Sequence, residues 1–167
     1  MTNKVHDERI QVDGIGEVSK LPGSPAGSSF WVGTFPYNDH GELKLINLYI
    51  CAEDDSVPSN ETLAFVSATI RSFDSHVESA RRLAGERLHL DPGFFGLEAH
   101  ESAKHLTDQS KLLPFGHPEP TFYGVDDWQI RFAESAIPRC SDLGVSVVFV
   151  GWTPDRIEEL SEDPMFE

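Results

Sequence analysis

A change of hydrophobic period along the chain constrains the fold more than any other feature of this sequence. Towards both ends, apolar residues alternate with polar ones or form short runs rich in aromatic and β-branched residues, which is typical of strands. In the middle, apolar residues recur at helical spacing. Strands followed by helices and then by further strands indicate an α+β domain. We therefore expect a mostly antiparallel sheet with helices packed on one face.

The first part of the sheet is expected before residue 52. Residues 9–19 are interpreted as one strand broken by a bend at its glycines, and residues 21–29, rich in Pro and Gly, as a loop. Residues 30–35 and 43–51 then predict a hairpin. The second hairpin strand has apolar residues on both faces, so we expect it to be central and covered on both sides.

Helical spacing begins after an acidic loop at residues 52–58. Ser59 or Asn60 offers an N-cap to a first helix. Asp74 can cap a second helix, which should end at residues 91–93, where the sequence is Asp-Pro-Gly. A third helix is predicted over residues 97–106.

The last part of the chain predicts one further hairpin. Residues 113–120 hold three prolines and a glycine and are interpreted as a loop, the best linker candidate. Residues 128–136 alternate strictly, and residues 145–150 form an apolar run, so both are predicted strands. Thr153 before Pro154 predicts the start of a short acidic helix. The expectation is a single domain over residues 1–167, with about five strands: three, then helices, then a hairpin.

Acidic residues are concentrated at the two ends of the chain. Of 167 residues, 28 are acidic and 13 basic, which gives a formal net charge of -15. Residues 1–70 hold 10 acids and 4 bases, residues 71–111 hold 7 and 6, and residues 112–167 hold 11 and 3. Such a field repels phosphate backbones, so we expect no direct nucleic-acid binding. It attracts a basic protein and speeds its association, although acidity that serves solubility alone remains an alternative.

The sequence also bears on compartment and redox state. No apolar run approaches the roughly 18 residues that a membrane-spanning helix needs, and the first residues lack the pattern of a secretory signal. We therefore expect a cytoplasmic protein without membrane contact. Cys51 and Cys140 are expected to be reduced thiols.

Motifs for catalysis or metal binding are weak. His100 and His105 are five residues apart, which does not place them on one helical face, so no metal site and no cofactor are expected. Residues 14–16 begin like a phosphate-binding loop but lack its third glycine, and a strand bend fits them better. Glu134, Asp126 and Asp127 are the carboxylates that acid–base chemistry could use. For Glu134, on an apolar strand face, structural pairing is the first interpretation.

Three acidic groups instead favour a protein-binding surface. Aromatic residues beside carboxylates can anchor a cationic partner, because Trp and Tyr anchor interfaces and acids raise the association rate. The first group, after the third expected strand, is Glu53, Asp54 and Asp55. The second, at the start of the strand expected at residues 128–136, is Tyr123, Asp126, Asp127 and Trp128. The third, at the C-terminal end, is Asp155, Glu158, Glu159, Glu162, Asp163 and Glu167.

Several segments resemble small bacterial immunity proteins that accompany polymorphic or contact-dependent growth inhibition toxins. These segments are Phe-Trp-Val-Gly at 30–33, a helix ending near Ser-Phe-Asp at 72–74, and the strand patterns at 128–134 and 144–149. The resemblance implies a cytoplasmic inhibitor, without catalytic residues, that neutralises a cognate and often basic nuclease toxin by covering it, and a monomer is favoured. A small hydrolase with acidic residues or histidine in a cleft is the second hypothesis, and a DNA mimic the third.

Overall fold

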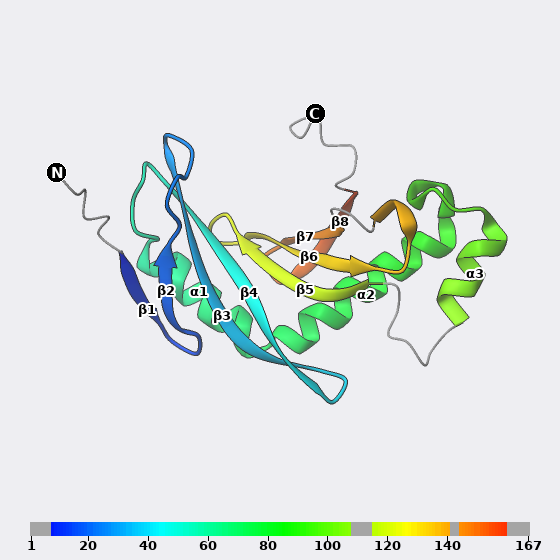
Figure 1. The fold of residues 1–167 in the computed structure, drawn as a ribbon, viewed down its shortest axis with the longest axis horizontal. Coiled ribbons are helices and arrows are strands. Elements are labelled where there is room, and N and C mark those ends of the chain that lie inside the picture. Colours follow the sequence, from blue (N-terminus) through cyan, green and yellow to red (C-terminus); the bar gives the residue numbers. More distant parts are fainter. Residues whose placement is uncertain (1–7, 108–114, 141–143, 160–167) are drawn as a thin grey trace.

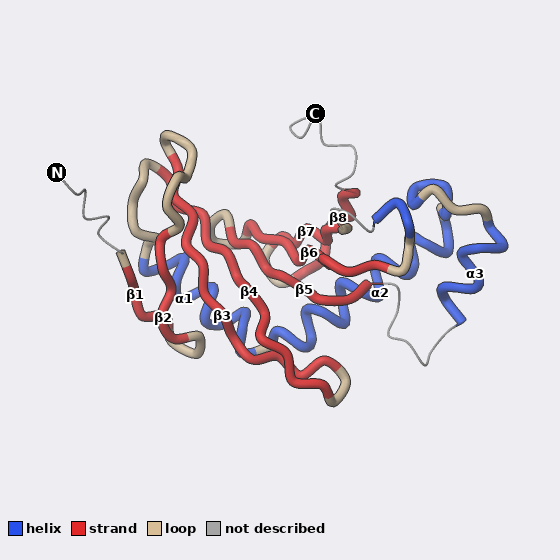
Figure 2. Tube along the Cα trace, viewed as in Figure 1, coloured by secondary structure: helices blue, strands red, loops and turns tan. Residues whose placement is uncertain are grey.

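The computed structural model describes residues 8–107, 115–140 and 144–159. They form eight strands, three α-helices and two short 3-10 helices (Figures 1 and 2). In chain order the elements are β1 (Arg9–Val12), β2 (Gly16–Lys20), β3 (Ser28–Asp39), β4 (Glu42–Glu53), α1 (Asn60–Arg71), α2 (Phe73–Leu90), η1 (Pro92–Phe95), α3 (Ala99–Thr107), β5 (Phe115–Phe122), β6 (Asp127–Ser135), η2 (Pro138–Cys140), β7 (Val145–Val150) and β8 (Thr153–Glu159).

All eight strands join one mixed sheet in which their spatial order equals their order in the chain. Every neighbouring pair is antiparallel except β4 and β5, which are parallel and are connected through the helices. The α+β class was expected, but the prediction of about five strands, arranged as three, then helices, then a hairpin, is wrong. Four strands precede the helices and four follow them.

The first extra strand comes from residues 9–19, predicted as one bent strand. Gly14 and Gly16 have φ angles of 80° and 105°, a region that glycine enters without steric cost. The chain therefore reverses between them, and β1 pairs antiparallel with β2.

The second extra strand, β5, lies where three prolines predicted a loop. Pro118 and Pro120 pair with Phe132 and Ile130 of β6, while pairing with β4 is confined to Tyr49–Thr121 and Ile50–Phe122. Proline lacks an N–H group, so it is tolerated where one side of a strand makes no ladder. β5 accommodates its prolines because it separates from β4 over that stretch.

The third extra strand, β8, replaces the predicted C-terminal helix. Gly151 and Trp152 form a two-residue turn, with a Gly151 φ of 60°, and β8 then pairs with β7 across a register shift near Val148. Ile157 packs against the buried residues. Pairing with a buried apolar strand outweighs the local helix signal of Thr153 and Pro154, because propensity yields to tertiary context.

Most helix boundaries follow the sequence, but the prediction that Asp74 caps the second helix is wrong, because α2 begins at Phe73 with Ser72 at its N-cap and Asp74 lies in the first turn. The Ser59 hydroxyl accepts the Thr62 N–H at 3.1 Å and caps α1, as predicted. The second helix ends at Leu90, and the Asp91 carboxylate accepts the Phe94 N–H at 3.2 Å in the turn that follows. In the described part of the chain, no helix combines the length and apolarity needed to cross a membrane.

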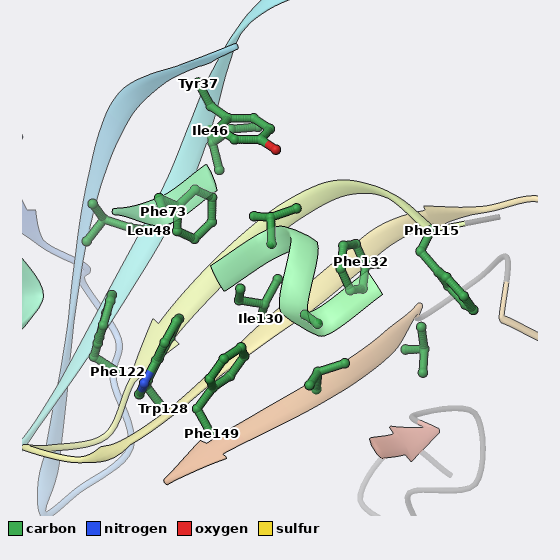
Figure 3. Packing of buried hydrophobic residues seen from close by; sticks show 14 of the residues in the cluster. Tyr37, Ile46, Leu48, Phe73, Phe115, Phe122, Trp128, Ile130, Phe132 and Phe149 are labelled. Atoms are coloured by element: carbon green, nitrogen blue, oxygen red, sulfur yellow. The ribbon is translucent and has the colours of Figure 1, made fainter. Parts of the chain in front are cut away.

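The core lies between the sheet and the helices α1 and α2, which cover one sheet face (Figures 1 and 3). Phe73 meets the rings of Phe35 and Tyr37 edge-on at 5.0 and 5.4 Å. His76 meets Trp128 and Phe149 in the same way at 5.3 and 5.9 Å. Burying each large apolar side chain contributes about 1.5–3 kcal/mol, so this layer holds the two halves of the sheet against the helices.

We call the opposite sheet face the open face. β4 is central, as predicted, but it is not covered on both sides. Ile46, Leu48 and Ile50 are fully buried towards the helices, whereas Leu43 and Leu45 are 74% and 71% exposed. The two-sided apolar pattern therefore marks one core face and one exposed apolar face.

A buried ion pair anchors the β3–β4 hairpin to α2. Arg81 donates from Nη1 to the Asp39 carboxylate at 3.1 Å and from Nε to the Phe115 carbonyl at 3.1 Å. Both charged side chains are almost fully buried. Burial alone would raise the pKa of Asp39, but hydrogen bonds and charges of Arg81 and Lys44 outweigh it and lower that pKa. The pair thus fixes the hairpin, α2 and β5 together.

Candidate functional site

Four turns meet at one end of the sheet, which we call the loop edge. They span residues 21–27, 54–59, 123–126 and 151–152. β4 and β5 are parallel, so the turns that follow them leave the sheet at the same end. Two backbone hydrogen bonds connect the turns, from Asp54 N–H to the Gly27 carbonyl at 3.0 Å and from Gly151 N–H to the Asp126 carbonyl at 2.9 Å. These bonds join the turns in two pairs, and the pairing of Ile50 with Phe122 places the ends of β4 and β5 side by side between them.

Two of the three predicted acidic groups lie at the loop edge. Glu53, Asp54 and Asp55 follow β4, and Asp126 and Asp127 lie between β5 and β6. All five are exposed. The sequence does not show that the two groups are neighbours, because about 70 residues separate them along the chain. The parallel pairing of β4 with β5 brings them to the same end of the sheet.

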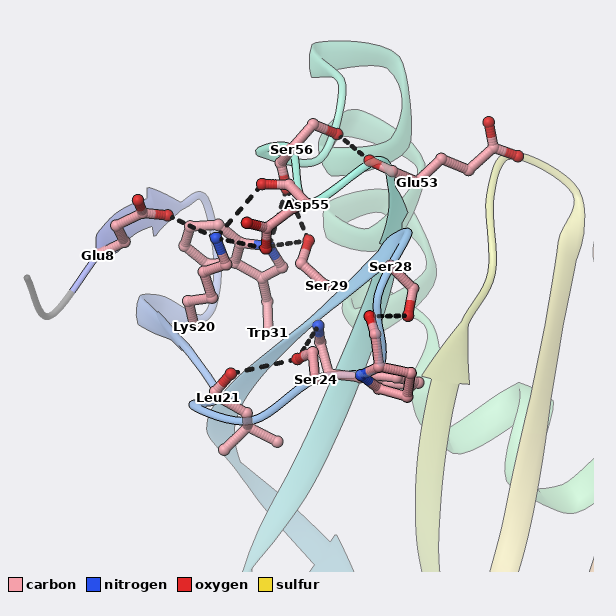
Figure 4. Close-up of polar contacts among 12 residues, drawn as sticks. Glu8, Lys20, Leu21, Ser24, Ser28, Ser29, Trp31, Glu53, Asp55 and Ser56 are labelled. Carbon is pink, nitrogen blue, oxygen red and sulfur yellow. Dashed lines mark hydrogen bonds and ion pairs between the residues drawn. The ribbon is translucent and has the colours of Figure 1, made fainter. Parts of the chain in front are cut away.

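The first acidic turn is held in place by hydrogen bonds (Figure 4). Ser56 donates from its hydroxyl to the Glu53 carbonyl at 2.6 Å, and its own carbonyl accepts the Ser29 hydroxyl at 2.7 Å. The Trp31 indole N–H reaches the same carbonyl at 3.3 Å. These bonds fix the backbone of the turn that carries the carboxylates, which lowers the entropy that binding must cost.

Lys20 is the cation that the structure places beside this turn. Its Nζ lies 2.9 Å from the Asp55 carboxylate and 3.1 Å from that of Glu8 (Figure 4). The hydrogen bonds to Asp55 and Glu8 raise the pKa of Lys20. Glu53 points away from this lysine in the figure. The carboxylates of the loop edge thus outnumber the positive charge that neutralises them.

Exposed aromatic and apolar side chains lie among these carboxylates. Tyr123 is 47% exposed, Val150 60% and Trp152 58%, and Val57 and Val125 also reach solvent. The Tyr123 hydroxyl accepts Gln129 Nε2 at 3.0 Å. Burial, followed by the charges of Cys51, Asp127 and Glu158, raises the pKa of Tyr123, so its hydroxyl stays protonated and available as a donor.

The two tryptophans at the loop edge have different places. Trp128, predicted as a surface anchor, is fully buried, stacks on Phe149 at 4.2 Å and donates to the Gly151 carbonyl at 2.7 Å. Trp152, which the sequence reasoning did not select, stacks on Phe65 of α1 at 6.1 Å and is largely exposed. Trp128 therefore supports the surface from below, and Trp152 is part of it.

Of the C-terminal acidic group, Asp155 and Glu158 are paired with a cation rather than free. Arg156 pairs with Asp155 at 3.2 Å and with Glu158 at 2.9 Å, and hydrogen bonds to Glu158 and then Asp155 raise the pKa of Arg156. Glu159 ends β8. Glu162, Asp163 and Glu167 lie outside the described residues.

The carboxylates considered for catalysis are not brought together. Asp126 and Glu134 lie at opposite ends of β6, about 26 Å apart along an extended strand. Glu134 is exposed, so burial does not force it into a pair. Within the described ranges, no group of three or more His, Cys, Asp or Glu side chains could hold a metal ion. Neither Cys51 nor Cys140 forms a disulfide in the described part of the chain, and burial raises the pKa of Cys51 to about 11.

A polar cluster on the open face was missed because residues 113–120 were interpreted as a loop. Arg131 of β6 donates to the Glu119 carboxylate of β5 at 2.5 Å, and His117 lies 3.4 Å from the second Glu119 oxygen. Ser146 of β7, directly across from Arg131, is fully buried. Glu119 and Arg131 offset each other's charge, whereas the buried Ser146 hydroxyl has no hydrogen-bond partner among the described residues.

Comparisons of the chain with family models, curated proteins and solved structures give no match. The interpretation of the loop edge rests on its own residues.

Proposed function

We propose that this protein is an inhibitor of the immunity type, which binds a basic toxin domain in the cytoplasm and neutralises it by stoichiometric contact through the loop edge. The observation that carries the proposal is the convergence of five exposed carboxylates with Tyr123 and Trp152 on one rigid surface. These residues come from turns far apart in the sequence.

Charge supports a basic partner. A net charge of -15 attracts a cationic domain over long range, and the local carboxylates orient it. Exposed charges more than about 10 Å apart are screened at 0.1 M salt. Binding should therefore be fast at low salt and weaken as salt is added.

The apolar residues supply the affinity that exposed charges cannot. Trp152 is held by stacking on Phe65 and by an indole hydrogen bond to Thr69 at 3.3 Å. An aromatic side chain that is already fixed loses little entropy when a partner covers it, and truncating such anchors typically costs about 2 kcal/mol or more of binding energy.

Co-purification with the candidate toxin encoded immediately upstream tests the proposal. We expect a one-to-one complex that protects cells from the toxin and blocks its activity in vitro. A Trp152→Ala variant should weaken the complex about 30-fold, which corresponds to 2 kcal/mol. Leu90→Ala, at an exposed residue on the end of α2, is the control. Absence of binding to such a neighbour contradicts the proposal.

A further inference from the structure

β8 is the last strand of the sheet, and the outer side of its backbone faces away from β7. In the described part of the chain it pairs with β7 alone. The Tyr123 N–H donates to the Asp127 carbonyl at 2.9 Å, so Asp127 bonds to β5 and the next residue, Trp128, bonds to β7. The same alternation across the paired strands leaves Val147, which is opposite Ile157, bonded to β6. The N–H and the carbonyl of Ile157 therefore point outward from the sheet.

A pocket of about 320 Å³ lies beside this strand, between β8 and the second half of α2. Leu83 of α2, Phe94 of η1 and Ile157 of β8 supply its apolar lining and pack against the core. The Arg87 guanidinium lies over the Phe94 ring, 4.7 Å from its centroid, and holds that wall in place. The volume is at the lower end of the range for ligand sites, so the pocket fits one large apolar side chain.

A strand edge beside a side-chain pocket is an arrangement that binds extended peptides. The edge supplies main-chain hydrogen bonds to an added strand, and the neighbouring pocket selects one of its side chains. Antiparallel pairing places one residue of the added strand directly opposite Ile157, with both side chains on the same face of the sheet. The Ile157 side chain lines the pocket. The residue opposite Ile157 would therefore enter the pocket as well.

The charges around the pocket select among partners. Arg87 is paired with Asp91 at 2.9 Å. Arg156 is paired with Asp155 at 3.2 Å and with Glu158 at 2.9 Å. Both arginines that line the pocket are thus engaged, and the excess of carboxylate attracts a basic segment. A second copy of this chain, with a net charge of -15, is repelled by the same carboxylates.

We propose that the β8 edge and this pocket bind an extended segment of another protein. The segment pairs with β8 as an added strand, inserts one apolar side chain into the pocket and carries lysine or arginine at the adjacent positions. Ile157 is four residues further along β8 than Thr153, about 13 Å from the loop edge. The site is a different surface from the loop edge, so this inference does not depend on the proposed function.

An NMR titration of the isotopically labelled full chain tests the proposal with a synthetic probe, acetyl-Thr-Val-Lys-Phe-Lys-Val-Thr-amide. The amide signals of Ile157 and Leu83 should shift, with a Kd on the order of 100 μM for one buried side chain and a few hydrogen bonds. A probe that is N-methylated at phenylalanine cannot donate to the Ile157 carbonyl and should bind at least about tenfold more weakly. A probe with glutamate in place of both lysines should bind at least about fivefold more weakly.

A pair of protein variants tests the pocket itself. Leu83→Gln makes the pocket polar at nearly the same side-chain size and should weaken binding of the probe at least about fivefold. Leu43→Gln makes the same change at a 74% exposed leucine of β4 and should bind the probe as wild type does. Circular dichroism establishes that both variants are folded.

Three results overturn the inference. The first is the absence of shifts at Ile157 and Leu83 with the probe at millimolar concentration. The second is equal binding of the probe and its N-methylated form, or equal binding of the probe by the Leu83→Gln and Leu43→Gln variants. The third is a shift of the Ile157 amide with protein concentration alone, which would show that a second copy occupies the edge.

Discussion

Replacing Arg81 with methionine should lower the free energy of unfolding by about 3 kcal/mol. Removal of one partner of a buried ion pair typically costs about 3–5 kcal/mol, because the other charge is left without compensation. Here Asp39 is 3% exposed and keeps only Lys44, at 3.3 Å. The Phe115 carbonyl also loses the donor it has at 3.1 Å.

Two features place the loss at the lower end of that range. Lys44 still compensates part of the Asp39 charge, and Arg81 Nη2 is buried without a hydrogen-bond partner among the described residues, so methionine removes a desolvation cost. For a domain of this size, each kcal/mol corresponds to about 2–4 °C in Tm. We therefore expect Tm to fall by about 10 °C.

Urea titration followed by circular dichroism measures this loss, with Arg82→Met, at an exposed position one residue further on, as control. The pKa of Asp39 is lowered in the fold, so its contribution is present above pH 3.8 and is lost as pH falls through the folded pKa. Arg81→Met should flatten that dependence. A loss within about 1 kcal/mol of the Arg82→Met control would refute the reasoning.

Three further predictions concern stability and reactivity. Burial lowers the pKa of His76 below 6.5, so the unfolded state takes up a proton before the folded state does. The free energy of unfolding therefore falls as the pH drops from 6.5 through the folded pKa. His76→Gln should reduce this dependence of unfolding free energy on pH in urea titrations, and an unchanged dependence contradicts the assignment. Burial places the pKa of the Cys51 thiol at about 11 rather than 9.0, so at pH 8 it should be about 100-fold less ionised than an exposed thiol and should be alkylated slowly. Alkylation of Cys51 at the rate of an exposed thiol would contradict this pKa. Gly144→Ala places Cβ 2.2 Å from the Phe132 carbonyl oxygen at a φ of 85° and should lower the free energy of unfolding by about 3 kcal/mol or more. Gly85→Ala, in open space on α2, should raise it by about 0.5–1 kcal/mol. Equal changes in the free energy of unfolding of the two variants would count against the geometry.

Local signals in the sequence predicted the helices and the central hairpins. The Ser59 cap, the stop after Leu90 and the apolar periodicity of α2 act within a few residues, and the structure confirms them. The same is true of the β3–β4 hairpin, whose turn lies at His40 and Gly41.

Non-local pairing decided the elements that the sequence misassigned. Pro118 and Pro120 argue locally for a loop, and only the separation of β5 from β4 makes them acceptable in a strand. Thr153 and Pro154 argue locally for a helix, but β7 offers a complete edge to pair with. Neither condition can be read from the segment itself.

The loop edge was predicted in part. Its carboxylates and Tyr123 were selected from composition alone, but their convergence depends on the parallel placement of β5 beside β4. Trp128 was selected for its neighbours and is buried, whereas Trp152 was missed because Thr153 and Pro154 were interpreted as the start of a helix. A hairpin turn that contains tryptophan was the signal that could have found it.

Isothermal titration calorimetry with a candidate toxin domain encoded immediately upstream tests the central claim most directly. The informative variant is Asp54→Asn with Asp126→Asn and Asp127→Asn, since Asn tolerates the positive φ of residues 54 and 126. Glu78→Gln with Glu86→Gln, on the exposed side of α2, is the control. The account predicts that the loop-edge variant binds at least about tenfold more weakly and with less salt dependence, while the control binds as wild type. Equal affinity of the two variants would contradict it.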